Sequence, residues 1–113
     1  MKECVIYKTM DLIGKKWSLL IILELYKNEK MGFNEVKRAL EDITPRMLSL
    51  RLTDLKKHGL IKSRMINKPI RVEYELTESG KDLIKLVNQI KEWSLKWIYP
   101  DEECYKDCKD CCL

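Results

Sequence analysis

The hydrophobic pattern changes its period after Gly59, and of all the features of the sequence this change most restricts which folds are possible. Before that residue, apolar side chains recur mostly at the spacing of one helical face. The segments 61–66 (IKSRMI) and 71–76 (RVEYEL) are predicted strands, the second clearly alternating, and an Asn-Lys-Pro turn at 67–69 joins them. Helical spacing then returns over 77–99, in a last helix that Thr77 is expected to cap. This order predicts a mainly helical α+β domain in which one hairpin follows several helices.

The first three helices have recognisable boundaries. The first is expected to end at Gly14, and the second, over 15–28, is apolar nearly all round and is therefore expected in the core. A turn is expected at 31–32, and Asn34 is expected to cap the third helix. The predicted inner face of this short helix consists of Val36, Ala39 and Leu40.

The fourth helix has the clearest boundaries. Thr44 is expected to cap it, and Pro45 fits its first position, where the missing N–H costs nothing. The helix is predicted to run to His58, which caps its end, with Gly59 as the stop. Its apolar face consists of three leucines at helical spacing: Leu48, Leu52 and Leu55.

The positive charge is concentrated in one stretch of the chain. The 113 residues, a length typical of one domain, have a formal net charge of +4. Residues 33–73 include ten Lys/Arg and five Asp/Glu, a balance of +5, and the remainder sums to −1. Clustered cations suit a polyanion such as nucleic acid, although on charge alone a solvated basic face is the simpler interpretation.

Several classes of protein are not expected. The longest uncharged apolar run, 17–23, is too short for a membrane span, and no export signal opens the sequence, so we expect a cytoplasmic protein without a membrane partner. The sequence has one histidine, no serine–histidine–carboxylate set at an interpretable spacing and no phosphate-cradling glycine loop. Enzymatic activity is therefore not predicted.

The order of elements is that of a winged helix-turn-helix. A major groove about 12 Å wide admits one helix, and a hairpin can follow the adjacent backbone or minor groove. We expect the helix over 45–58 to enter the groove and the helix over 33–40 to position it. The start of the groove helix and its face away from the leucines supply the candidate DNA contacts Thr44, Arg46, Met47, Ser49, Leu50 and Thr53. Arg51, which lies between this face and the apolar one, is a further candidate.

Four of these residues are expected to reach base edges. Arg46, Met47, Ser49 and Leu50 lie near the helix start, where such helices usually contact bases. An arginine can fork onto guanine and a leucine can contact a thymine methyl group. Thr44 is expected mainly as a cap, with a backbone amide that can still bind phosphate.

The remaining cations have two interpretations each. Arg51 lies nearer the apolar face, where an ion pair and a phosphate contact are equally expected. The hairpin supplies Arg64, Lys68 and Arg71, which are expected to contact phosphate or the minor groove. The alternative is a charged sheet edge that resists aggregation.

Three stretches of the sequence resemble the HxlR-type family of winged-helix transcriptional regulators: LIGKKWSLLIILEL, FNEVKRALEDITPRMLSLRLTDLKKHGLI and VEYELTESGKDL. The position of Cys4 and a last helix containing EWSLKW add to a likeness that covers roughly residues 4–98. It implies a homodimer, joined through the first and last helices, that binds a palindromic operator. It also implies oxidant or electrophile sensing through Cys4. The chain departs from the family pattern at Lys15, where a glycine is common, and at Val5, where proline commonly follows the cysteine.

The last predicted helix has apolar residues at positions 83, 86, 90, 93 and 97. These alternating steps of three and four form a heptad seam, which needs a partner helix. Leu83 and Leu86 are expected to belong to the core. Ile90, Trp93 and Trp97 lie further along and are expected in a dimer interface, where aromatic residues are enriched.

Four of the five cysteines lie in the last ten residues, CYKDCKDCCL. Our first expectation is that Cys104, Cys108, Cys111 and Cys112 bind zinc or an iron–sulfur cluster, since soft thiolates select such centres. The second is a redox switch in which a tail thiol forms a disulfide with Cys4. The third is a frayed tail with incidental thiols.

These expectations combine into one predicted function. Residues 1–99 form a winged helix-turn-helix domain with dimerisation helices, and residues 100–113 form a cysteine-rich tail. The protein is predicted to be a homodimeric, repressor-type regulator that reads double-stranded DNA, with cysteines that report redox state or a bound metal. The alternative is a small redox or metal-carrying protein whose winged domain binds another protein.

Overall fold

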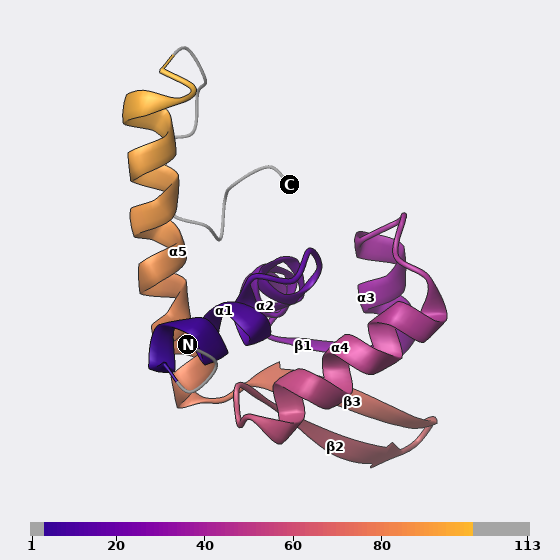
Figure 1. Ribbon diagram of the computed structural model, residues 1–113. Coiled ribbons are helices and arrows are strands. Elements are labelled where there is room, and N and C mark those ends of the chain that lie inside the picture. The colour runs from indigo at the N-terminus through magenta and orange to yellow at the C-terminus, as the bar shows by residue number, and fades with distance from the viewer. Residues whose placement is uncertain (1–3, 101–113) are drawn as a thin grey trace.

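A computed structural model of the protein describes residues 4–100 and consists there of five helices and one small sheet (Figure 1). This confirms the predicted mainly helical α+β class. The elements are α1 (Val5–Ile13), α2 (Ser18–Asn28), β1 (Lys30–Gly32), α3 (Phe33–Ala39), α4 (Pro45–Lys57), β2 (Ile61–Asn67), β3 (Ile70–Leu76) and α5 (Glu78–Trp97).

The sheet is antiparallel and has the order β1-β3-β2. The predicted hairpin is present, and we call β2, β3 and their turn the wing. The strand β1, however, replaces the turn expected at 31–32. Met31 lies opposite Tyr74 in the β1–β3 register, and Ser63 lies opposite the same tyrosine on the other side. The third strand therefore connects the wing to the start of α3.

The core forms around α2, as its all-round apolar sequence predicts. Ile21 and Ile22 are completely buried, and leucines from α4 pack into the same cluster. The expected apolar face of α4 is confirmed, because Leu48, Leu52 and Leu55 are all buried. Burying such side chains contributes about 1.5–3 kcal/mol each, so this face fixes the rotation of α4 about its own axis.

The cap predicted for α3 is wrong. Gly32 is the N-cap, and the Glu35 carboxylate accepts its backbone N–H at 3.1 Å, the reciprocal bond of a capping box. Asn34 lies inside the first turn because β1 runs directly into the helix. Val36 and Leu40 are buried as predicted, whereas Ala39 is exposed at the helix end.

The ends of α4 agree with the sequence. The Thr44 hydroxyl accepts the Met47 N–H at 3.1 Å, and Pro45 occupies the first turn. His58 is the C-cap, with Nδ1 2.9 Å from the Asp54 carbonyl oxygen. Gly59 has a φ of 77°, a left-handed value that favours glycine just past a helix.

Helix α5 stands along one side of the molecule (Figure 1). Thr77 caps it as predicted, accepting the Gly80 N–H at 3.4 Å. Ile84 is buried and Leu83 is partly buried against the core, but Leu86 is 53% exposed. The core position expected for Leu86 is therefore wrong, because α5 turns a different face to α2 than the heptad seam suggests. No helix in the described part of the chain is long and apolar enough to cross a membrane.

Candidate nucleic-acid interface

The face of α4 opposite its leucines is open to solvent. Arg46, Ser49 and Thr53 are exposed along it, and Leu50 is 51% exposed although it is apolar. Unlike the three buried leucines of the helix, Leu50 is not part of the core cluster of the described residues or packed against it. The arrangement leaves one guanidinium, two hydroxyl groups and one branched apolar side chain available on the side of the helix that faces away from the core.

Three other candidates on this helix have different surroundings. The hydroxyl of Thr44 is occupied by its cap bond, as expected. Met47 is partly buried against the core, so less of it is available than its position in the sequence suggests. Arg51 is also partly buried, and among the described residues it has no ion pair, which leaves the phosphate contact as a prediction.

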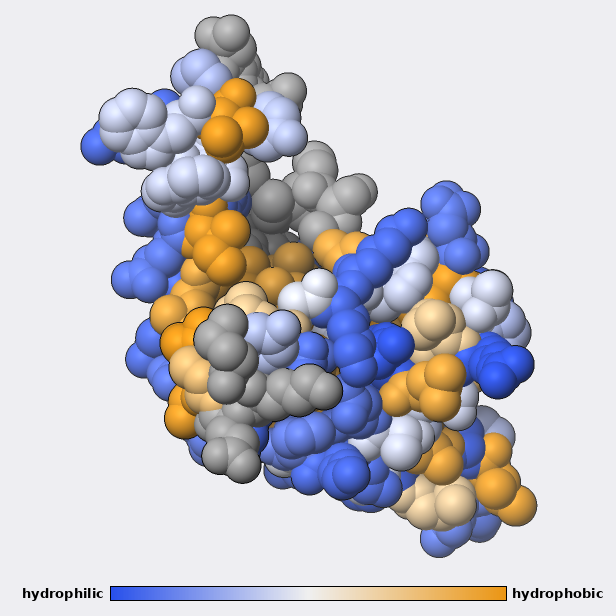
Figure 2. Space-filling model, viewed as in Figure 1, coloured by the Kyte–Doolittle hydropathy of each residue, from blue (hydrophilic) through white to orange (hydrophobic). Residues whose placement is uncertain are grey.

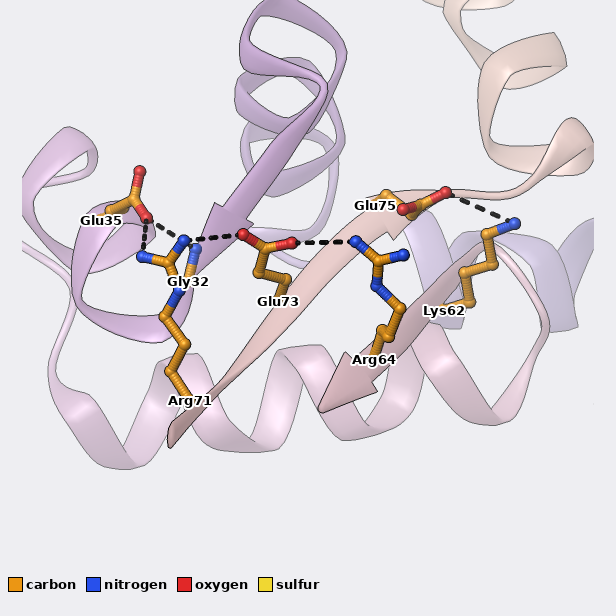
Figure 3. A network of polar contacts seen from close by, with 7 residues as sticks. All are labelled: Gly32, Glu35, Lys62, Arg64, Arg71, Glu73 and Glu75. Carbon is orange, nitrogen blue, oxygen red and sulfur yellow. Dashed lines mark hydrogen bonds and ion pairs between the residues drawn. The ribbon is translucent and has the colours of Figure 1, made fainter. Parts of the chain in front are cut away.

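Both predicted arginines of the wing are paired with acids (Figure 3). Arg64 lies opposite Glu73 in the β2–β3 register, with Nη2 3.6 Å from Oε1. Arg71 donates a 2.9 Å hydrogen bond to Oε2 of the same carboxylate. Its Nη1 lies 3.7 Å from Oε1 of Glu35 in α3. The Glu73 side chain is 16% exposed, so two cations compensate one largely buried carboxylate.

The same contacts join the wing to the helix before α4. Oε1 of Glu35 accepts the Gly32 N–H and also faces Arg71, so one oxygen serves the α3 cap and the wing. Further along the sheet, Lys62 lies 3.4 Å from Glu75. Lys68, at the wing turn, is exposed and has no ion pair in the described region. Of the three predicted wing cations, it is the one without an acidic partner among residues 4–100.

A small pocket between α4 and the wing brings together residues from both elements. Ser49 and Thr53 of α4 line it with Lys56, and Ser63 and Tyr74 line it from the sheet. The last three residues were not among the predicted contacts. Helical spacing puts Lys56 one turn after Thr53, and alternation puts Tyr74 on the inner strand face, but only the packing of helix on sheet brings them together.

The expected dimer residues are exposed along α5. Trp93 is 57% and Trp97 65% exposed, and Ile90 is also open to solvent. Met10 and Ile13 of α1 line an apolar groove with Ile90 and Trp93, about 370 Å³ in volume. Figure 2 shows hydrophobic side chains gathered along α5 and beside α1. The two helices thus present one continuous apolar surface.

The cysteine predictions fall mostly outside the described residues. Cys4 is the N-cap of α1, and its thiol is exposed and free. Within residues 4–100, no three His, Cys, Asp or Glu side chains are grouped so that they could hold a metal ion. Cys104, Cys108, Cys111 and Cys112 lie beyond the described part of the chain, so the metal site and the tail disulfide remain predictions.

Comparison with known proteins identifies the family. The model of the HxlR-like helix-turn-helix family matches residues 12–102. The HTH-type transcriptional regulator YvaP of Bacillus subtilis is 37% identical over 94 residues, which cover 82% of this chain and 86% of YvaP. The reduced form of the transcriptional regulator YodB from B. subtilis superimposes with a TM-score of 0.78 at 27% identity, covering 88% of this chain and 98% of YodB. The redox regulator HypR in its oxidised form superimposes with a TM-score of 0.73 at 34% identity, covering 89% of this chain and 100% of HypR. The chain belongs to the HxlR-like helix-turn-helix family and is an HTH-type transcriptional regulator.

Proposed function

We propose that two copies of this chain form a dimer that binds double-stranded DNA with α4 in the major groove. The observation that carries the proposal is the two-sided character of α4. Its leucine face is buried, while Arg46 and Leu50 are exposed and suit guanine and thymine edges, respectively. A helix held rigidly on one side by core packing is well suited to present side chains to base edges on the other.

The dimer proposal rests on the exposed apolar surface of α1 and α5. Aromatic and aliphatic side chains at this density are typical of the core of a protein interface. In a dimer with two-fold symmetry, this surface of each copy covers the same surface of the other copy. The two-fold axis also relates the two α4 helices, as a palindrome relates its two half-sites. The two α4 helices would then occupy successive major grooves about 34–36 Å apart.

Replacement of Arg46 tests the DNA-binding proposal. The measurement is a fluorescence titration of Arg46→Gln and the unsubstituted protein with the DNA upstream of the protein's own coding sequence and with a scrambled duplex. We expect the variant to lose affinity for the upstream DNA by roughly tenfold or more and for the scrambled duplex by much less. Equal losses on both would make Arg46 a phosphate contact.

The outcome for the unsubstituted protein decides between the two functions. Tighter binding of upstream than of scrambled DNA supports the regulator. Equal binding, or none, would contradict it and favour a redox or metal-carrying protein whose winged domain binds another protein. The regulator would act in the cytoplasm, and no catalytic step is part of the proposal.

We also propose that the cysteines give the regulator its input, either as a redox switch involving Cys4 or as a zinc or iron–sulfur site in the tail. The exposed, free thiol of Cys4 and the four tail cysteines support this proposal. The test is purification without oxygen, followed by quantification of zinc, iron and free thiols. Metal bound per chain would support a tail site, and its loss from a variant with the four tail cysteines replaced by serine would locate it. Five free thiols without metal, and no disulfide after oxidation, would contradict both forms.

A further inference from the structure

The pocket between α4 and the wing has an unusual lining. It is about 230 Å³ in volume, room for several water molecules at about 30 Å³ each, and therefore for a phosphodiester group. Its polar lining consists of Ser49, Thr53 and Lys56 from the helix and Ser63 and Tyr74 from the sheet. Every one of these five side chains carries a hydrogen-bond donor. No acidic residue lines the pocket.

The donors of this pocket are not used by the protein itself. Within residues 4–100, none of the four hydroxyl groups has a side-chain hydrogen bond, and the Lys56 ammonium has no ion pair. A tyrosine hydroxyl keeps its proton at neutral pH, and burial raises the pKa of the Tyr74 phenol further from that range. Unused donors that converge on one small space favour a ligand with several acceptor oxygens and negative charge.

The surroundings favour a DNA phosphate as that ligand. The pocket adjoins the exposed face of α4, where Ser49 and Thr53 also belong to the side expected to meet DNA. A helix in the major groove and a wing beside it have a sugar–phosphate backbone between them. The wing arginines are held by Glu73 and Glu35, whereas Lys56 is not paired in this way.

We propose that this pocket binds one backbone phosphate at the edge of the major groove, with Lys56 supplying the charge and the hydroxyl groups of Ser63 and Tyr74 supplying hydrogen bonds from the wing. The site would fix the register of α4 on the DNA and contact helix and wing at once. The inference rests on the proposed DNA-binding function, and it adds three contacts that the sequence did not predict.

The first test compares two neighbouring lysines. Lys56→Gln and Lys57→Gln each remove one positive charge from the last turn of α4, but only Lys56 lines the pocket. The dependence of affinity on salt is measured on a short duplex selected for tight binding from a random library. Because the substitution removes this contact from both subunits of the dimer, we expect Lys56→Gln to reduce the slope of log K against log salt by about 1.8. Lys57→Gln should reduce it by less than half of that. Equal reductions would overturn the assignment.

Tyr74→Phe tests the pocket without a change of charge. It removes only the hydroxyl, and we expect the affinity for selected and scrambled duplexes to fall by a similar factor, roughly fivefold to tenfold. Unfolding temperatures of all three variants, measured without DNA, show whether folding is retained. Unchanged affinity in a folded Tyr74→Phe protein would remove the tyrosine from the site.

The decisive experiment locates the phosphate. Single phosphates of the selected duplex are replaced by neutral methylphosphonates, and each duplex is titrated with the unsubstituted protein and with Lys56→Gln. We expect one position on each half-site where the two changes are not additive, since both remove the same contact. Additive losses at every position would overturn the phosphate pocket while leaving DNA binding intact. Failure of the unsubstituted protein to bind any duplex would overturn the proposed function, and this inference with it.

Discussion

The side-chain hydroxyl of Thr77, at the start of α5, donates a hydrogen bond of 2.5 Å to the carbonyl oxygen of Gly59, just past the end of α4. Ser79 donates a second bond of 2.8 Å to the same oxygen, and the Thr77 backbone N–H reaches the Leu60 carbonyl oxygen at 3.0 Å. The helix proposed to read DNA is thereby attached to the helix that carries the apolar surface.

Replacement of Thr77 by valine tests this joint. Valine keeps the shape of the side chain but removes both the bond to Gly59 and the cap of α5. We expect the free energy of unfolding to fall by about 1–2 kcal/mol, measured by urea denaturation. The matched control is Ser79→Ala, which leaves the cap and the Thr77 bond in place and should cost less than about 1 kcal/mol. Equal losses in the two variants would show that the cap contributes little.

Gly80 tests how closely α5 approaches the end of α4. In most helices Gly→Ala stabilises by roughly 0.5–1 kcal/mol. Here an added Cβ would overlap the Leu60 carbonyl oxygen, which is fixed backbone. We therefore expect Gly80→Ala to destabilise by about 1–3 kcal/mol in the same assay. At Gly32 the nearest atom is a movable Glu35 carboxylate oxygen at 3.4 Å, so Gly32→Ala should cost less than about 1 kcal/mol. A stabilised Gly80→Ala protein would contradict the close approach.

The features predicted correctly are those with local causes. The Thr44 cap, the Gly59 stop and the Thr77 cap each depend on a few adjacent residues, and the leucine face of α4 follows from helical spacing. Strand β1 was missed because three residues show no alternation, and its extended form is stabilised by pairing with the distant β3. The N-cap of α3 could not be predicted for the same reason. Gly32 is the cap because β1 ends there and α3 begins at the next residue.

The candidate site was less predictable than the fold. The sequence shows where the wing arginines are, but not that Arg71 lies between Glu73 and a glutamate of α3. The pocket beneath α4 likewise requires knowledge of which strand face packs on the helix. Leu86 was misplaced because a heptad seam and a core face are adjacent on α5, and spacing alone does not say where one ends. Tertiary contacts decide each of these cases.

Glu35→Gln tests whether the acid that α3 presents to the wing restrains the wing arginine Arg71. Glutamine can still accept the Gly32 N–H as a capping-box residue, but it no longer attracts the Arg71 guanidinium. If Arg71 exchanges Glu35 for phosphate on binding, the variant should bind DNA several-fold more tightly. The salt slope should be steeper by up to about 1.8, since both subunits of the dimer carry the change.

The control for this prediction is the same substitution in an Arg71→Gln background. A gain that comes from the release of Arg71 should disappear there, because the two changes are then coupled. A gain of equal size in both backgrounds would instead reflect the general removal of negative charge near DNA. In that case Arg71 would serve to hold the wing against α3.

The apolar surface of α1 and α5 leads to the last prediction. We expect the protein to sediment as a dimer, with twice the chain mass of 13.5 kDa. Trp93→Glu places a charge in the groove that α1 and α5 line. It should weaken the dimer by tenfold or more, as the loss of a buried aromatic anchor usually does. The control is Lys85→Gln, which changes the net charge by the same amount at an exposed position of α5 that does not line the groove. A Trp93→Glu protein that stays dimeric would move the interface elsewhere. A monomeric variant that still binds a single half-site, but not the whole palindrome with the affinity of the dimer, would show that this surface sets the spacing of the two α4 helices.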